Sequence, residues 1–141
     1  MLALMAGCSP APEQAAHIRW QQYEPSLLLQ AAEQQRPVMI NFHADWCAPC
    51  LELEKYTFSD DRVVQASAEF LPLVVDWSDY ESMEEQLPGG AGTLQKQFRV
   101  LGLPAILFLD TLGEEVREAR VSGYLDPEEL IEQMQRALGS S

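Results

Sequence analysis

The 141-residue sequence predicts a single α/β domain in which helices cover both faces of a central mixed β-sheet. Three short, mostly apolar runs at residues 38–42, 70–76 and 104–110 have the composition of buried strands. Segments with helical spacing separate these runs. A further helical segment follows the last run and opens with the capping sequence at residues 126–129. Hydrophobic residues make up 47 % of the chain, which is enough for one packed core.

The N-terminal part of the domain is expected to contain an edge strand, a helix and a central strand. Residues 17–20 alternate between polar and apolar side chains, which is typical of a short edge strand. Ser26 is placed to cap a helix that Pro37 ends. The run at residues 38–42 then forms the central strand, because it is short and mostly apolar.

The middle of the chain is expected to contain two helices and a second buried strand. The first helix should begin at Cys47 and continue to about Tyr56. Ser59 or Asp60 is placed to cap the second helix. The run at residues 70–76 follows as the strand.

The C-terminal part ends in the element with the strongest sequence signal. Before it we expect, in chain order, an acidic loop at 77–92, a helix at 93–98, a strand at 104–110, a turn at 110–113 and a hairpin strand at 116–121. In the last helix Asp126 occupies the N-cap, Pro127 the first helical position and Glu129 the third. Its predicted buried stripe consists of Leu130, Ile131, Met134 and Leu138.

The charge balance excludes two classes of partner. The chain has 22 acidic and 9 basic residues and a formal net charge of −13. Nucleic acids and anionic lipid surfaces both bind basic patches, so we expect neither as an electrostatic partner. No stretch approaches the roughly 20 apolar residues that span a bilayer.

The first 16 residues are expected to lie outside the folded domain, which we assign to residues 17–141. Residues 1–7 are small and apolar, and Cys8 follows them as in a bacterial lipoprotein signal, where the cysteine is lipidated. We interpret the segment as a signal remnant and a flexible tether. A basic n-region is missing, so a tail with an incidental cysteine remains the alternative.

The motif Cys47-Ala48-Pro49-Cys50 is the candidate for chemistry. Two cysteines three residues apart lie close together on the first turn of a helix. Unpaired N–H groups and the helix dipole stabilise a thiolate at the N-terminus, so Cys47 is the predicted attacking sulfur. Cys50, one turn further on, is more shielded and is the predicted resolving thiol.

Two other roles for the motif remain open. If the two cysteines were half of a zinc site, the chain would have to supply two more ligands. It has only His17 and His43 as histidines and no second pair of cysteines at this spacing. A structural disulfide would close a very short loop and so add little stability through chain entropy. We therefore favour a redox role, and we predict neither a metal nor a cofactor.

Three segments of the chain carry a family resemblance. Residues 42–50, Phe-His-Ala-Asp-Trp-Cys-Ala-Pro-Cys, look like the active-site segment of thioredoxin-like proteins. Together with residues 54–60 and 100–108 they closely resemble the C-terminal periplasmic thioredoxin-like domain of the DsbD family of thiol:disulfide interchange proteins. The resemblance covers most of the folded part, and it implies a thioredoxin fold.

The resemblance also implies roles for individual residues. The two cysteines would be the nucleophile and its resolving partner. Pro104 would be a cis-proline facing the disulfide, and the backbone of Leu103 would hydrogen-bond a bound partner segment. Trp46 would pack beside the disulfide, and Pro49 would stiffen the turn; we include both in the predicted substrate-binding set.

The chain departs from the family pattern at the position of a buried acid. Asn41 stands there, and an amide does not exchange a proton at neutral pH. Glu54 matches a second acid of the DsbD domain and follows Cys50 by four residues, so it would tune the thiols or relay a proton; the alternative is a solvated surface residue. Leu51 stands where thioredoxins commonly carry lysine.

The sequence therefore predicts a monomeric thiol:disulfide oxidoreductase that exchanges its dithiol with partner proteins, in the reductive direction. Its expected location is the periplasm of a Gram-negative bacterium, with a lipid anchor on Cys8. Its expected partners are disulfide-containing or dithiol periplasmic proteins and a membrane electron donor. The alternatives are a peptide-binding or chaperone-like module with a structural disulfide, and a disulfide oxidant or isomerase.

Overall fold

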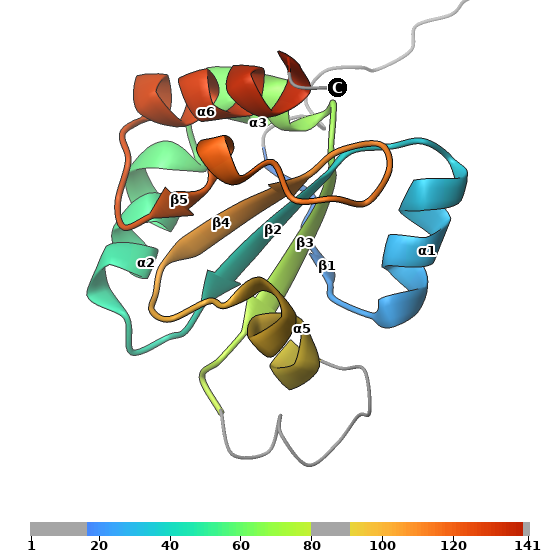
Figure 1. Ribbon diagram of the computed structural model, residues 1–141. Helices are drawn as coiled ribbons and strands as arrows, with labels where there is room; N and C mark the ends of the chain where they lie inside the picture. Colours follow the sequence, from blue (N-terminus) through green and yellow to red (C-terminus); the bar gives the residue numbers. More distant parts are fainter. Residues whose placement is uncertain (1–16, 80–90, 140–141) are drawn as a thin grey trace, which may run out of the picture.

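A computed structural model describes residues 17–79 and 91–139, and it confirms the predicted α/β architecture (Figure 1). Five strands form one mixed sheet in the order β1-β3-β2-β4-β5. The strands are β1 (Gln21–Gln22), β2 (Val38–His43), β3 (Leu71–Asp76), β4 (Ala105–Leu109) and β5 (Val121–Ser122). The helical elements are α1 (Pro25–Glu33), α2 (Ala48–Glu52), η2 (Leu53–Thr57), α3 (Asp61–Ser67), α5 (Ala91–Phe98), η3 (Arg117–Ala119) and α6 (Pro127–Gly139).

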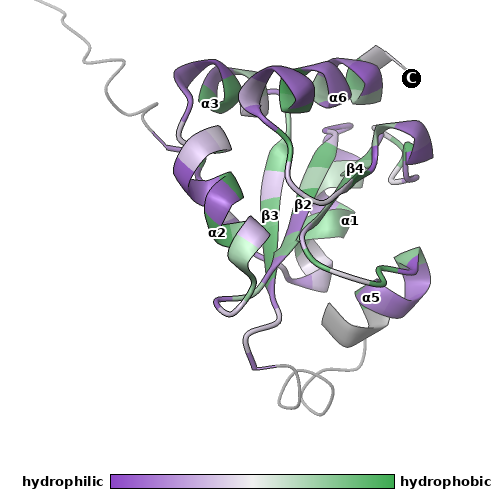
Figure 2. Cartoon of the chain, turned by 90° about the vertical axis from the view of Figure 1, so that its left-hand side faces the viewer, coloured by the Kyte–Doolittle hydropathy of each residue, from purple (hydrophilic) through white to green (hydrophobic). Residues whose placement is uncertain are grey.

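The central strand β2 pairs in parallel with β3 and antiparallel with β4. Its side chains alternate between the two faces of the sheet. Val38, Ile40 and Phe42 join one core cluster with α1 and α5, whereas Met39 joins a second cluster with α3 and α6. The helices therefore cover both faces, and the apolar strands lie between their hydrophilic outer surfaces (Figure 2).

The prediction of an edge strand at residues 17–20 is wrong in position. The strand pairing begins at β1, whose two residues pair with Leu73 and Val74 of β3. Ile18 is buried, and the Trp20 ring packs edge-on against Phe58 with 5.2 Å between centroids. The alternation of apolar residues at 17–20 thus reflects packing on the core rather than strand pairing.

The two predicted helix caps had different outcomes. Ser26 does not cap α1: Glu24 is the N-cap residue, and Pro25 occupies the first helical position, where its fixed φ favours a helix start. At α3 the predicted cap Asp60 is confirmed, because its carboxylate accepts the Arg62 N–H at 2.9 Å. Ser59, the other candidate, instead donates to the Lys55 carbonyl.

The hairpin predicted at residues 116–121 is only partly present. An isolated bridge joins Leu109 to Glu115, and β5 pairs with Ala105 and Ile106. The short 3-10 helix η3 lies between them and buries Ala119. A continuous strand is therefore absent here, because the segment turns inward toward the core.

The N-terminus of α6 is confirmed as a capping box. The Asp126 carboxylate accepts the Glu129 N–H at 2.9 Å, and the Glu129 carboxylate accepts the Asp126 N–H at 3.1 Å. The predicted stripe is wrong at its end, where Ala137 is buried and Leu138 is exposed. At about 100° per residue, seven positions return almost to the direction of Leu130, whereas eight do not.

Several predictions lie outside the described residues. These are the tether at residues 1–16, the lipidation of Cys8 and most of the acidic loop at 77–92. Across the two described ranges, no helix combines the length and apolar character that crossing a membrane requires.

Candidate functional site

The disulfide lies at the start of α2. Cys47 is the N-cap residue of this helix and is bonded to Cys50, with 5.3 Å between their Cα atoms. The Cys50 N–H points at Cys47 Sγ, at 3.3 Å. Cys47 is 6 % exposed and Cys50 is 2 % exposed. The sulfur of the more exposed residue, Cys47, thus receives a backbone N–H, and such a contact stabilises a thiolate once the bond is reduced.

The sequence predicted one regular helix from Cys47 to about Tyr56, but the α-helix ends at Glu52. After α2 the chain widens into the π-helical turn η2, where the Phe58 N–H donates to the Leu53 carbonyl at 2.8 Å. Leu53 and Thr57 are both buried in this turn, and the Thr57 hydroxyl donates to the Leu125 carbonyl at 2.6 Å. This contact with a segment far along the chain is one that local spacing does not predict.

The Leu103–Pro104 peptide bond is cis, as the resemblance implied. Ala105, the next residue, pairs with Phe42 in the antiparallel register of β4 with β2. The register places Pro104 at the end of the sheet where β2 leads into the disulfide turn. The Pro104 carbonyl accepts the N–H of Gly123, the residue directly after β5, at 3.1 Å.

Apolar side chains are exposed around this end of the sheet. Trp46, directly before the disulfide, is 64 % exposed, and Leu51 and Leu101 are also exposed. Leu103 is partly buried and lines a groove with Pro104. An exposed apolar rim of this kind fits contact with a protein partner.

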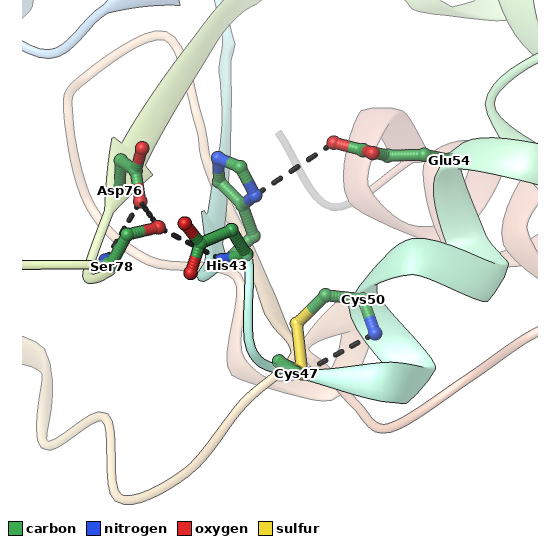
Figure 3. Close-up of a disulfide and its surroundings, with 7 residues drawn as sticks. His43, Cys47, Cys50, Glu54, Asp76 and Ser78 are labelled. Carbon is green, nitrogen blue, oxygen red and sulfur yellow. Dashed lines mark hydrogen bonds and ion pairs between the residues drawn. A yellow bond between two sulfur atoms is a disulfide. The ribbon is translucent and has the colours of Figure 1, made fainter.

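A polar cluster lies beside the disulfide turn (Figure 3). His43 Nδ1 is 3.8 Å from Glu54 Oε1, and the two side chains are 20 % and 50 % exposed. Asn41 is buried two residues before His43, and strand alternation places both on one face of β2. Among the described residues, neither Asn41 Oδ1 nor His43 Nδ1 has a hydrogen-bond partner.

Asp76 lies on the other side of His43, because the two residues are directly paired between β2 and β3. Burial raises the pKa of Asp76, but hydrogen bonds from the Ser78 hydroxyl and N–H, together with the charge of His43, lower the pKa below its ordinary value. The Ser78 hydroxyl also accepts the Asp45 N–H at 2.8 Å. Ser78 thereby connects Asp76 to the turn that leads to Cys47.

An arginine–glutamate pair supports the segment that leads to Pro104. Arg120 donates to both carboxylate oxygens of Glu115, at 2.6 and 2.7 Å. The same guanidinium donates to the carbonyls of Phe98 and Arg99 at the C-terminal end of α5, at 2.5 and 3.3 Å. Four hydrogen bonds from one side chain thus join the residue directly before β5 to Glu115 and to the start of the loop before Pro104.

The structure brings most of the predicted site residues to one end of the sheet, including both cysteines, Pro104 and Glu54. Sequence reasoning did not identify His43, Asp76 or Arg120 as parts of the site. A histidine four residues before the first cysteine was a possible signal for the first of these. In the part of the chain that the structure describes, no three His, Cys, Asp or Glu side chains are grouped to hold a metal ion.

Comparisons with known proteins agree with this geometry. A sequence profile described as thioredoxin-like matches residues 19–111. The thiol:disulfide interchange protein DsbD of Yersinia pestis is 43 % identical over 105 residues, which is 74 % of this chain and 16 % of that protein. The chain therefore spans about a sixth of the length of the curated relatives it matches.

Solved structures show the same fold. The oxidised C-terminal domain of DsbD from Neisseria meningitidis superposes with a TM-score of 0.65 at 23 % identity, covering 79 % of this chain and 90 % of that domain. A thioredoxin from Thermus thermophilus also gives a TM-score of 0.65, at 27 % identity, with coverage of 85 % and 86 %.

Proposed function

The chain belongs to the thioredoxin-like family, and from that premise we propose that it is a thiol:disulfide oxidoreductase acting through Cys47 and Cys50. The observation that carries the proposal is the disulfide at the N-terminus of α2, with the Cys50 N–H directed at Cys47 Sγ. A bond between cysteines so close in sequence adds little to stability, but it can open and close readily in exchange.

The proposed reaction has two steps. The Cys47 thiolate attacks a partner disulfide, and one partner sulfur leaves as a thiolate. Cys50 then attacks Cys47 Sγ in the mixed disulfide, which closes the Cys47–Cys50 bond and releases the reduced partner. Trp46, Pro49, Leu103 and Pro104 form the proposed contact surface for the partner segment.

We propose that the chain works in the reductive direction, as a DsbD-like electron carrier in the periplasm. The Ala-Pro pair between the cysteines resembles that of reducing thioredoxins more than that of oxidants, which carry histidine there. The proposed partners are disulfide-containing proteins on one side and a membrane electron donor on the other.

Trapping of mixed disulfides tests this function. A Cys50→Ser chain should complete the first step and remain bound to its partner, because no resolving thiol is left. Incubation with a periplasmic extract, followed by non-reducing electrophoresis and mass spectrometry, should identify these adducts. The matched Cys47→Ser chain should form none, and equal adduct formation by both variants would contradict the assigned roles.

The reduction potential distinguishes the alternatives. A reductant should have a potential near that of thioredoxin, about −270 mV, whereas an oxidant lies near −120 mV. A bond that partner thiols do not reduce would instead indicate a binding module with a structural disulfide.

We further propose that Cys8 carries a lipid anchor. The small apolar residues before it support the proposal, as does the removal of an unpaired thiol from an exported protein. Mass spectrometry of the mature N-terminus should detect the acyl chains on Cys8. An unmodified Cys8 in membrane-free protein would contradict the anchor.

A further inference from the structure

We propose that Arg99 selects partner segments that carry an acidic residue close to their reactive cysteine. The inference rests on the proposed function and names the substrate class of the same site. It starts from the groove beside Pro104, which has a volume of about 440 Å³. The groove is lined by residues 99–105 and by Arg120, Ser122 and Gly123.

The groove is cationic, although the chain as a whole carries 22 acidic and 9 basic residues. Among the described residues that line it, the charged ones are Arg99 and Arg120. Arg120 is already paired with Glu115 and with two backbone carbonyls. Arg99 is exposed and forms no ion pair within the two described ranges, not even with Glu114 or Glu115 of the neighbouring cavity. The uncompensated positive charge of the groove therefore belongs to Arg99.

Arg99 is held in a backbone conformation that few residues other than glycine adopt. Its φ is 53°, in the left-handed region, directly after α5 where glycine is favoured. The Arg99 N–H donates to the Lys96 carbonyl at 3.3 Å, and the Val100 N–H donates to the Gln95 carbonyl at 3.1 Å. The Arg99 carbonyl accepts a hydrogen bond from Arg120 at 3.3 Å. Strained positions of this kind persist where surrounding contacts enforce them, and they cluster at functional sites. The turn thus fixes Arg99 at the wall of the groove.

The groove leads from Arg99 to the disulfide end of the sheet. Pro104 is followed by Ala105, which pairs with Phe42 of β2, and the turn to Cys47 follows β2. In Figure 1 the segment between α5 and β4 lies at the same end of the sheet as the connection from β2 to α2. Five residues of chain span at most about 18 Å, so an extended segment with its cysteine beside Pro104 reaches Arg99 within about five positions.

A carboxylate is the chemistry that fits this end of the groove. The planar guanidinium binds a carboxylate with two parallel hydrogen bonds, and it repels a lysine or arginine placed there. The net charge of the chain acts in the opposite sense, because a formal charge of −13 repels an acidic partner as a whole. The test therefore has to separate the local contact from the overall charge.

The test compares two disulfide peptides that differ by one glutamate or glutamine, placed about three positions from the cysteine. For each chain, kcat/KM for the glutamate peptide is divided by kcat/KM for the glutamine peptide. This ratio should be about threefold higher in wild type than in Arg99→Asn, as expected for an exposed ion pair. Asparagine removes the charge but tolerates the left-handed backbone. The difference should lie in KM rather than kcat, because the contact assists binding, and it should vanish in about 1 M salt.

Arg117 provides a matched control, because it is exposed and lines the neighbouring cavity but not the groove. Arg117→Asn changes the net charge equally and should keep the wild-type ratio. Arg99→Lys should keep most of the preference for glutamate. Arg99→Gly suits the left-handed backbone, so it should lose the preference without losing stability in urea unfolding.

Two results would overturn the inference. One is a wild-type ratio in folded Arg99→Asn or Arg99→Gly, and the other is an equal loss of the preference in Arg117→Asn, which would assign the effect to net charge. Absence of any exchange by the wild-type chain with either peptide would instead refute the proposed function.

Discussion

Replacing Cys47 by serine is expected to lower the rate of disulfide reduction by at least about three orders of magnitude. The attacking group in exchange is a thiolate, and a serine hydroxyl does not ionise at neutral pH. Cys50 should not substitute for Cys47, because at 2 % exposure it is the less exposed of the two residues. Turnover of a fluorescent disulfide peptide with excess dithiol measures the effect.

The matched control is Cys8→Ser, which makes the same chemical change at the remaining cysteine. This variant should reduce the peptide at the wild-type rate, since the proposed chemistry uses only the other two cysteines. Unfolding curves of both variants show whether the fold is retained. Reduction by folded Cys47→Ser at a rate comparable with wild type would refute the proposed function.

Replacing Arg120 by methionine is expected to destabilise the fold by about 3 kcal/mol, at the lower end of the range for a broken buried ion pair. The destabilisation should come mainly from Glu115, whose side chain is only 6 % exposed and would lose both of its charged hydrogen bonds. The carbonyls of Phe98 and Arg99 would also lose their donor. Urea unfolding monitored by circular dichroism measures the loss.

Two further variants show how much of the lost stability comes from the charge of Arg120 and how much from leaving Glu115 unpaired. Arg120→Lys keeps the charge but lacks the planar fork, so it should recover only part of the stability. In the double variant with Glu115→Met, no buried charge is left unpaired, and much of the loss should disappear. A single Arg120→Met variant within about 0.5 kcal/mol of wild type would show that the pair is not a stabilising contact.

The features that local patterns encode were predicted well. The apolar runs became β2, β3 and β4, because a strand buried on both faces requires such a run wherever it lies in the chain. The capping box at Asp126 formed as expected, since all its contacts lie within one turn. The disulfide between Cys47 and Cys50 belongs to this group, because two residues three apart meet on any helical turn.

Predictions failed where packing between distant segments decides the local structure. Residues 116–121 were predicted to form a hairpin strand, but contacts with the core and with α6 turn part of them into η3. Likewise, the π-helical turn at η2 accompanies the contact of Thr57 with Leu125, which lies 68 residues later. No pattern within a short window contains this information.

The sequence by itself thus determined the fold class, the redox pair and, through the family resemblance, the cis-proline at Pro104. Only the tertiary structure showed that His43 meets Glu54 and Asp76, and that Arg120 joins Glu115 to the end of α5. The physical reason is that these side chains come from different elements. Their meeting depends on the strand order and on how the helices pack, whereas the sequence-derived features depend on neighbours along the chain.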